Sequence, residues 1–200
     1  MASRQYQMGQ RAIQFHETRD RIVHAAVRLH GEIGVRETSW EAVGKRAGVS
    51  TATVYRHFPT LEALIPACTQ VAFAAGAQLP TSAELTSLFA GLTTPSKRLE
   101  RVIAESCRCY ERGEGWLDAS RKEAGAIPAL ADAVRTQDRA LDAIIAAAVG
   151  SQTARAKKGA LKALLDFPFW KSLVDAGVPR AKAPAVIADL ALRVVEQPGR

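Results

Sequence analysis

The stretch AGVSTATVYRHF, residues 47–58, decides the fold of this 200-residue chain. Gly48 permits a left-handed turn, and Ser50 is a typical cap for the short helix that follows. Before the turn, residues 39–47 show helical spacing, and Thr38 and Ser39 are the cap residues at the start of this helix. Two short helices joined by a glycine turn predict a helix-turn-helix, whose second helix enters the major groove of DNA.

The second of these helices has two different faces. Val54 and Phe58 fall on one side and are expected to anchor the helix to a core. The other side carries small, hydroxylated and basic residues, which suit contact with base edges and phosphates. Each residue alone fits an ordinary cap or surface position equally well, but together they favour DNA. This side consists of Ala52, Thr53, Arg56 and His57.

A longer helix is expected before the motif. In residues 18–34, Ile22, Ala26, Leu29 and Ile33 recur at intervals of three and four, and Gly34 supplies a stop. Residues 1–17 are more polar and are expected to form a flexible arm. Within the motif, Gly44 indicates close packing of another backbone segment.

The remainder of the chain also reads as helical. Helical segments are expected at 61–79, near 84–92, from 95 to 113, from 128 to 150 and towards the C-terminus, and no alternating pattern indicates a sheet. The prediction is therefore an all-α protein with about nine or ten helices.

Charge and composition narrow the class of protein. The net charge is +7, and residues 1–60 hold nine Lys or Arg against five Asp or Glu, which favours a polyanionic partner. No apolar run approaches the ~18 residues of a membrane span, and the N-terminus has no signal-peptide core. We therefore expect no membrane contact and a cytoplasmic location.

Catalytic and metal-binding patterns are missing from the sequence. Cys107 and Cys109 lie about 200° apart on an expected helix and cannot hold one ion from it, while Cys68 is remote in sequence. No G-x-S-x-G or H-E-x-x-H motif occurs. We expect no enzyme activity, no metal and no cofactor.

Residues 19–64 resemble the TetR family of bacterial transcriptional regulators. The similarity lies in SWEAVGKRAGVSTATVYRHFPTLEAL and in the preceding RDRIVHAAVRLHGEIG. It implies a DNA-binding domain at 1–62, with the helix-turn-helix at about 39–58, and an effector-binding and dimerisation domain at 63–200. Two positions depart from the family pattern. Leu61 stands where Lys or Arg often holds a phosphate, and Trp40 stands where a smaller residue is usual.

The resemblance also implies roles for individual residues. Base contacts fall on Thr51, Ala52, Tyr55 and Arg56, and phosphate contacts on Thr53, His57 and the start of the second helix, Ser39 and Trp40. Trp40 is expected to pack against the preceding long helix, although its indole N–H could reach a phosphate. The expected effector pocket is lined by Phe73, Phe89, Cys107, Tyr110 and Trp116. The expected dimer surface, drawn from the last long helices, contains Leu130, Val134, Leu141, Ile144, Phe167, Phe169 and Trp170; the alternative for the three rings is internal core.

The function that follows is that of an effector-responsive repressor. A homodimer would bind a palindromic operator in double-stranded DNA, and a small-molecule effector would release it. Two alternatives stay open. One is a ligand-independent or activating regulator with the same DNA-binding head, and the other is a helical adaptor that works through protein contacts.

Overall fold

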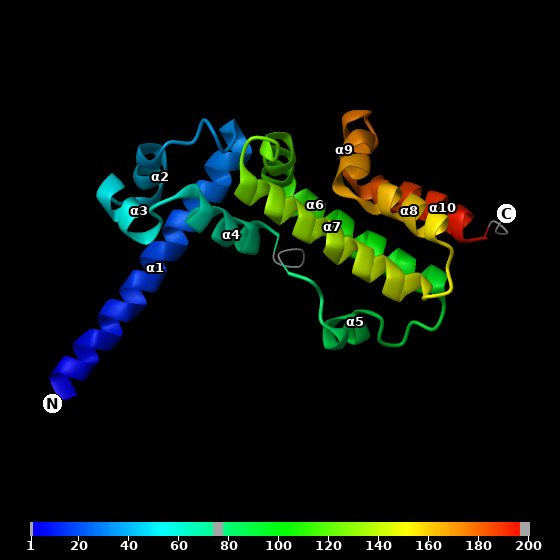
Figure 1. Cartoon of the computed structure of the whole chain (residues 1–200), viewed down its shortest axis with the longest axis horizontal. Coiled ribbons are helices and arrows are strands. Elements are labelled where there is room, and N and C mark those ends of the chain that lie inside the picture. Colours follow the sequence, from blue (N-terminus) through cyan, green and yellow to red (C-terminus); the bar gives the residue numbers. More distant parts are fainter. Residues whose placement is uncertain (1, 74–77, 197–200) are drawn as a thin grey trace. The chain divides into compact units, whose positions relative to one another are not determined.

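The computed structural model describes residues 2–73 and 78–196, with side chains from residue 9 onward. All regular structure in these residues is helical, which confirms the all-α class (Figure 1). None of the described helices is both long and apolar enough to cross a bilayer. The helices are α1 Ala2–Ile33, α2 Trp40–Ala47, α3 Thr51–His57, α4 Leu61–Ala72, α5 Ser82–Leu88, α6 Pro95–Glu123, α7 Pro128–Val149, α8 Arg155–Leu165, α9 Phe167–Asp175, the 3-10 helix η2 Arg180–Lys182 and α10 Ala183–Glu196.

The chain divides into two compact units. The first comprises the described residues of 1–72 and 115–133, and the second those of 73–114 and 134–200. Helices α6 and α7 each contribute one part to either unit. The domain boundary predicted between residues 62 and 63 falls inside α4, a helix that packs against α1 in the first unit.

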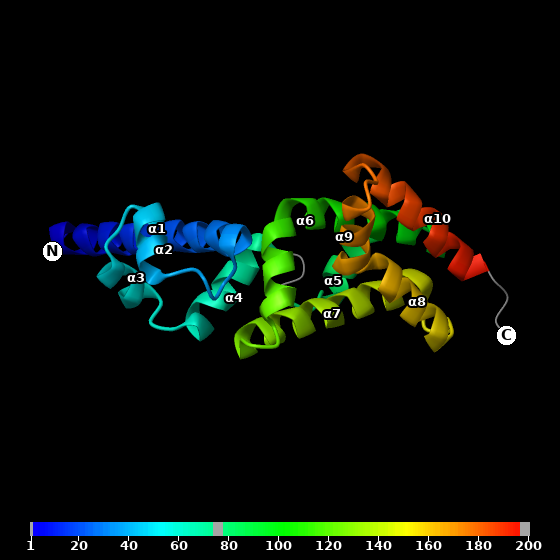
Figure 2. The same ribbon diagram turned by 90° about the horizontal axis from the view of Figure 1, so that it is seen from above.

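The first unit is built around the C-terminal half of α1. Ile22, Ala26 and Leu29 are buried there, as their spacing predicted, whereas Ile33, the fourth residue of that pattern, is 50% exposed. The helix ends at Ile33 before Gly34, whose φ is 92°. A left-handed φ of this kind is readily available only to glycine. Helices α2 and α4 pack against α1, and α3 packs against α2 (Figures 1 and 2).

Two helix boundaries differ from the prediction. The segment 1–17, expected as an irregular arm, is helical from Ala2, because no proline interrupts it and α1 continues through it into the core. The helix expected at 61–79 ends at Ala72; Phe73 is outside it and stacks on Tyr110, with ring centroids 6.2 Å apart. The expected continuation through 74–77 lies outside the described residues.

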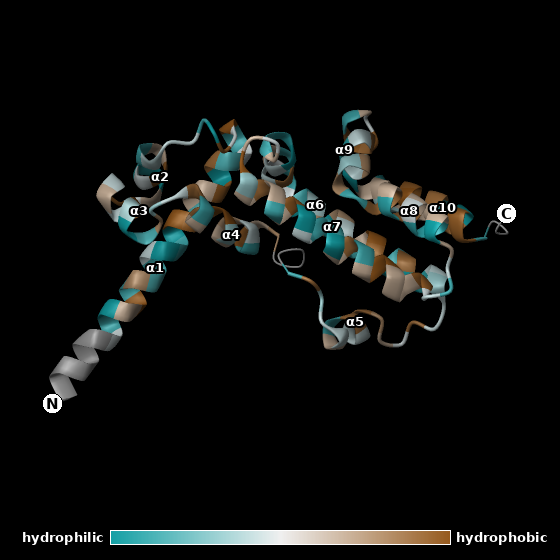
Figure 3. Cartoon of the chain, in the orientation of Figure 1, coloured by the Kyte–Doolittle hydropathy of each residue, from teal (hydrophilic) through white to brown (hydrophobic). Residues whose placement is uncertain are grey.

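The second unit packs α10 against α8 and α9. Asp166 caps α9 by accepting a hydrogen bond from the Phe167 amide at 2.7 Å, and Pro168 occupies the first turn, where its missing N–H costs nothing. The chain therefore breaks between α8 and α9 at DFPFW, as expected. Brown, apolar segments recur along α10 in Figure 3, on a helix of high mean hydropathy.

Candidate nucleic-acid interface

The inner face of α3 is anchored as the sequence predicted. Val54 and Phe58 are both essentially buried. The Arg19 guanidinium lies 4.8 Å from the centre of the Phe58 ring, so a cation–π contact from α1 covers this end of α3. The opposite face of α3 is thereby fixed in orientation.

Local hydrogen bonds define both short helices. Ser39 caps α2 by accepting from the Ala42 amide at 3.1 Å, and Ser50 caps α3 by accepting from the Thr53 amide at 3.2 Å. Thr38, the other cap candidate, instead donates its hydroxyl to the Gly34 carbonyl at 2.6 Å. The caps satisfy helix N–H groups that otherwise lack partners.

The turn between α2 and α3 requires its glycines. Gly48 has a φ of 68°, as expected for the left-handed end of α2. At Gly44, an added Cβ would lie 3.0 Å from the Val49 carbonyl oxygen and 3.4 Å from the Val54 side chain. The close backbone approach predicted at Gly44 is therefore present.

The outer face of α3 carries the residues expected to read bases. Ala52, Tyr55 and Arg56 are exposed and Thr51 is partly exposed. Tyr55 leaves 48% of its surface accessible, and its ring centroid is 5.4 Å from that of Trp40 in α2. Trp40 therefore has an aromatic contact with α3; the packing expected between Trp40 and the preceding long helix stays a prediction. This pair forms an aromatic edge beside Arg56 that sequence reasoning did not identify.

Thr53 and His57, the expected phosphate contacts on α3, are partly buried. The Thr53 hydroxyl is 2.9 Å from the Ser50 hydroxyl, and the His57 ring lies 4.2 Å from the ring of Phe15 in α1. Desolvation lowers the pKa of His57, and the positive charges of Arg56 and Arg19 lower it further. Because the ordinary value is already 6.5, His57 is neutral at pH 7.5.

This neutrality determines the expected effect of His57→Ala. At pH 7.5 the substitution should leave the slope of log binding constant against log salt concentration unchanged, because no cation is removed. Arg56→Ala removes a permanent cation from the same face and should therefore reduce the magnitude of that slope. Fluorescence anisotropy with duplex DNA over a salt series measures both slopes, and a reduced slope for His57→Ala would show that its imidazole is charged in the complex.

The residues expected to line one effector pocket have different ring partners. Trp116 belongs to the first unit, where its ring lies 5.7 Å from that of His30. In the second unit Phe73 stacks on Tyr110, whose hydroxyl donates to the Leu165 carbonyl at 2.8 Å. Phe89 is instead covered by the Arg98 guanidinium, 5.7 Å from its ring centre. Whether these residues line one pocket stays a prediction.

Cys107 is the fifth of these residues and is buried. Burial raises the pKa of its thiol to about 11, and the nearby Glu111 acts in the same direction. The pKa of Cys68 is raised to about 12, also by burial. Both side chains are therefore protonated thiols at neutral pH and behave as small core residues.

Most residues expected at the dimer surface are enclosed within one chain. Phe167 and Trp170 are 2% and 1% exposed because they pack with Tyr110 in an aromatic cluster of the second unit. The alternative of internal core is therefore correct for these two rings. Leu130 and Leu141 are also buried, whereas Val134, Ile144 and Phe169 remain partly exposed.

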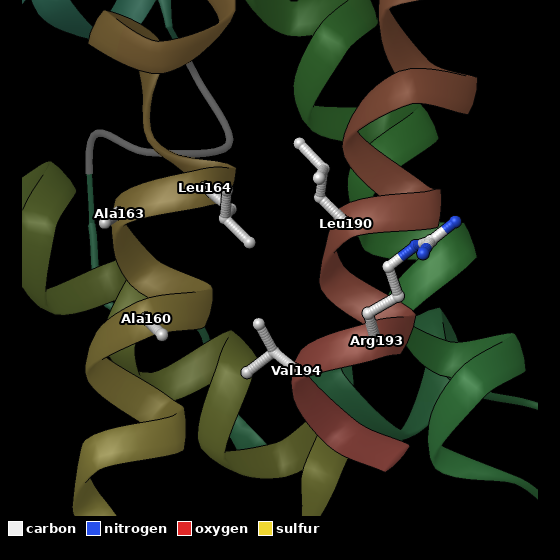
Figure 4. A pocket seen from close by; sticks show the side chains of 6 residues that line it. All are labelled: Ala160, Ala163, Leu164, Leu190, Arg193 and Val194. Carbon is white, nitrogen blue, oxygen red and sulfur yellow. The ribbon is translucent and has the colours of Figure 1, made fainter. Parts of the chain in front are cut away.

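An apolar groove lies elsewhere in the second unit, between α8 and α10. Its volume is about 490 Å³, and Leu164 and Val194 point into the space between the two helices (Figure 4). Leu190, at the upper end of the groove in that view, is 36% exposed. The lining residues are Ala160, Ala163, Leu164, Leu190, Arg193 and Val194. The sequence did not predict a groove between these two helices.

The described residues contain no cluster of three or more His, Cys, Asp or Glu side chains arranged to hold a metal ion. In the first unit, exposed residues of the types that contact DNA lie on α3, which packs against α2; Figure 1 shows the position of these two helices.

Comparison with known proteins agrees with this face. Residues 22–68 match the family model described as bacterial regulatory proteins, tetR family. No curated protein matches the sequence significantly. These matched residues contain α2, α3 and the buried part of α1 that supports them.

Solved structures share the fold along most of the chain. A putative TetR-family transcriptional regulator from Rhodococcus sp. superposes with a TM-score of 0.67 at 21% identity, covering 90% of this chain and 100% of its own. A TetR-family member from Streptomyces coelicolor A3 gives 0.64 at 23%, covering 86% and 97%. The multidrug binding protein EbrR, complexed with ethidium, gives 0.57 at 25% identity, covering 86% and 97%.

The braced helix-turn-helix and the family match to residues 22–68 lead to the same assignment. Residues 22–68 therefore form an N-terminal domain of the kind that the tetR family model describes, and the chain shares its fold with solved TetR-family structures.

Proposed function

We propose that the protein is a transcriptional repressor that binds a palindromic operator as a homodimer and is released by a small-molecule effector, in the cytoplasm. The observation that carries the DNA-binding part is the outer face of α3, where Tyr55 and Arg56 are exposed while Val54 and Phe58 lock the helix from behind. Small residues at the start of α3, Thr51 and Ala52, allow its backbone to approach base edges.

Specific recognition by one short helix is limited, which supports a two-fold dimer. Two copies of the head would contact half-sites about 34–36 Å apart, one helical turn of DNA. The surface that suits self-association best is the α8–α10 groove. Ala160 and Ala163 are small enough to admit a neighbouring helix, and Leu190 is exposed beside them. A second copy of this chain is the occupant that we propose.

The dimer surface is tested by placing a charge in it. Leu190→Glu should weaken the free energy of dimerisation by about 2 kcal/mol or more, because association would bury an unpaired carboxylate. Sedimentation over a concentration series measures the change. Leu79→Glu is the matched control, since Leu79 is 54% exposed outside the groove. Equal dissociation constants for Leu190→Glu and the native protein would exclude this surface.

The effector part of the proposal rests on the second unit and on a relative. EbrR, which has a similar fold, was solved in complex with the small organic molecule ethidium. In this chain, the stacked rings of Phe73 and Tyr110 are the place that we propose for an aromatic compound. Such a compound must bind the DNA-free geometry more tightly than the DNA-bound one.

Operator release is the corresponding experiment. A compound selected from a library because it raises the melting temperature of the protein should weaken operator binding when it is titrated into the complex. Unchanged operator affinity at saturating compound would favour a ligand-independent regulator. A reporter gene behind the operator distinguishes repression from activation. Native protein that binds no DNA even without a compound would favour an adaptor.

A further inference from the structure

A carboxylate distant in sequence is bound to the loop between α1 and α2. Glu123 is the last residue of α6, and its two oxygens accept hydrogen bonds from the amides of Val35 at 2.7 Å and Arg36 at 2.8 Å. All three residues belong to the first compact unit. Two consecutive backbone amides bound by one carboxylate form a charge-assisted contact that is stronger than a neutral one.

The loop is built around this carboxylate. Gly34 has a φ of 92°, and a Cβ there would lie 2.7 Å from Glu123 Oε1. Val35 is 1% exposed, so its amide is held in a dry environment where an unmet hydrogen bond is costly. A side chain at Gly34 would thus be strained by the backbone and would collide with the group that binds the next two amides.

Close packing of α1 and α6 brings Glu123 to the loop. An added Cβ on Gly31 would lie 3.1 Å from the Gly115 carbonyl carbon, and one on Gly115 would lie 3.0 Å from Gly31 Cα. The rings of His30 and Trp116 pack beside this crossing, with centroids 5.7 Å apart. Glu123 follows Gly115 by about two helical turns, which fixes its place relative to the end of α1.

The loop leads directly to the start of α2. Thr38 donates its amide to the Val35 carbonyl at 3.2 Å and its hydroxyl to the Gly34 carbonyl at 2.6 Å. Ser39 then caps α2. Only three residues of hydrogen-bonded turn separate the Arg36 amide from the N-terminus of α2. The position of the Val35 and Arg36 amides therefore determines where α2 begins, and Ser39 and Trp40 are expected to contact phosphates there.

We propose that Glu123 is a positioning residue for DNA binding: it binds the amides of Val35 and Arg36 and so holds the N-terminus of α2 at the height required for phosphate contact. This inference rests on the proposed DNA-binding function. Glu123 acts through the loop and does not itself touch DNA, a carboxylate being repelled by phosphate.

The test compares Glu123→Ala and Glu123→Gln with Glu84→Ala. Glu84 belongs to the capping box of α5 in the second unit and accepts a hydrogen bond from the Thr81 amide at 2.7 Å. Glu84→Ala therefore makes the same change in net charge as Glu123→Ala and removes the same kind of hydrogen bond. Operator affinity is measured on the full chain at a temperature where each variant is folded. Amide hydrogen exchange reports the opening of Val35 and Arg36.

Glu123→Ala should accelerate exchange at Val35 and Arg36 and weaken operator binding by roughly 2- to 30-fold. Glu123→Gln, which keeps one acceptor oxygen, should fall between the alanine variant and the native protein. Glu84→Ala should bind the operator like the native protein. If Glu123→Ala fails to fold, Glu123→Gln carries the same comparison.

A double-mutant cycle with Ser39→Ala separates positioning from general stabilisation. If Glu123 acts through the start of α2, Ser39→Ala should cost less affinity in the Glu123→Ala protein than in the native one. Strictly additive losses, or native affinity despite faster exchange at Val35 and Arg36, would overturn the inference. Native protein that binds no DNA from a random pool would reject the proposed function, and this inference with it.

Discussion

Replacing Tyr55 or Arg56 with alanine is expected to weaken specific operator binding by about 1–3 kcal/mol in each case. Arg56 is exposed on α3 and offers a planar fork that matches the acceptors of guanine. Tyr55 presents a rigid ring beside Trp40, 5.4 Å between centroids, and its loss would also remove support for that indole. Binding to random DNA should decline much less, because it depends on phosphate contacts.

Gel-shift or anisotropy titrations with operator and scrambled duplexes measure this difference. Arg155→Ala is the matched control for Arg56→Ala, since Arg155 is exposed at the start of α8 in the second unit and its removal makes the same change in net charge. Specificity ratios equal to that of the native protein in both α3 variants would show that α3 does not read bases.

The second large effect concerns His30 and the stability of the first unit. Burial lowers the pKa of His30 to about 4, and this shift is only partly offset by the negative charge of Glu123 and by the Gly34 backbone. Between about pH 6.5 and 4 the unfolded chain therefore binds a proton that the folded chain does not. The free energy of unfolding therefore rises with pH across this window. Neutral His30 contributes about 3 kcal/mol to it above pH 6.5, and this contribution is lost as the pH falls to about 4.

Urea denaturation of the native protein and His30→Leu measures this contribution. Leucine is similar in size and does not titrate. Between pH 7.5 and pH 5, the free energy of unfolding of the variant should therefore fall by about 2 kcal/mol less than that of the native protein. His24→Leu, at an exposed position of the same helix, is the control for histidine loss. Parallel pH dependences for His30→Leu and the native protein would mean that His30 titrates normally in the folded state.

Local chemistry made the helix-turn-helix predictable. Gly48 needs a left-handed φ, Ser50 has a hydroxyl at cap distance, and Val54 and Phe58 share a face of one short helix. Each of these rules acts over four residues or fewer. The sequence of residues 47–58 therefore determines both the turn and the buried face without reference to the rest of the chain.

Contacts between distant segments were not predictable in this way. Glu123 is 88 residues from Val35, and Phe15 reaches His57 only because α1 extends N-terminally beyond its buried half. Phe167 was predicted at the dimer surface because it lies in DFPFW, an apolar stretch between two helices. Its burial depends on the placement of Tyr110, which one sequence does not specify.

The most direct test of the account is selection of bound DNA from a random duplex pool by the native protein. We predict that the recovered sequences contain two inverted half-sites with centres one helical turn apart, and that Arg56→Ala relaxes the same base position in both halves. Recovery of sequences without inverted symmetry, or of no enriched sequence at all, would contradict recognition by a two-fold pair of α3 helices.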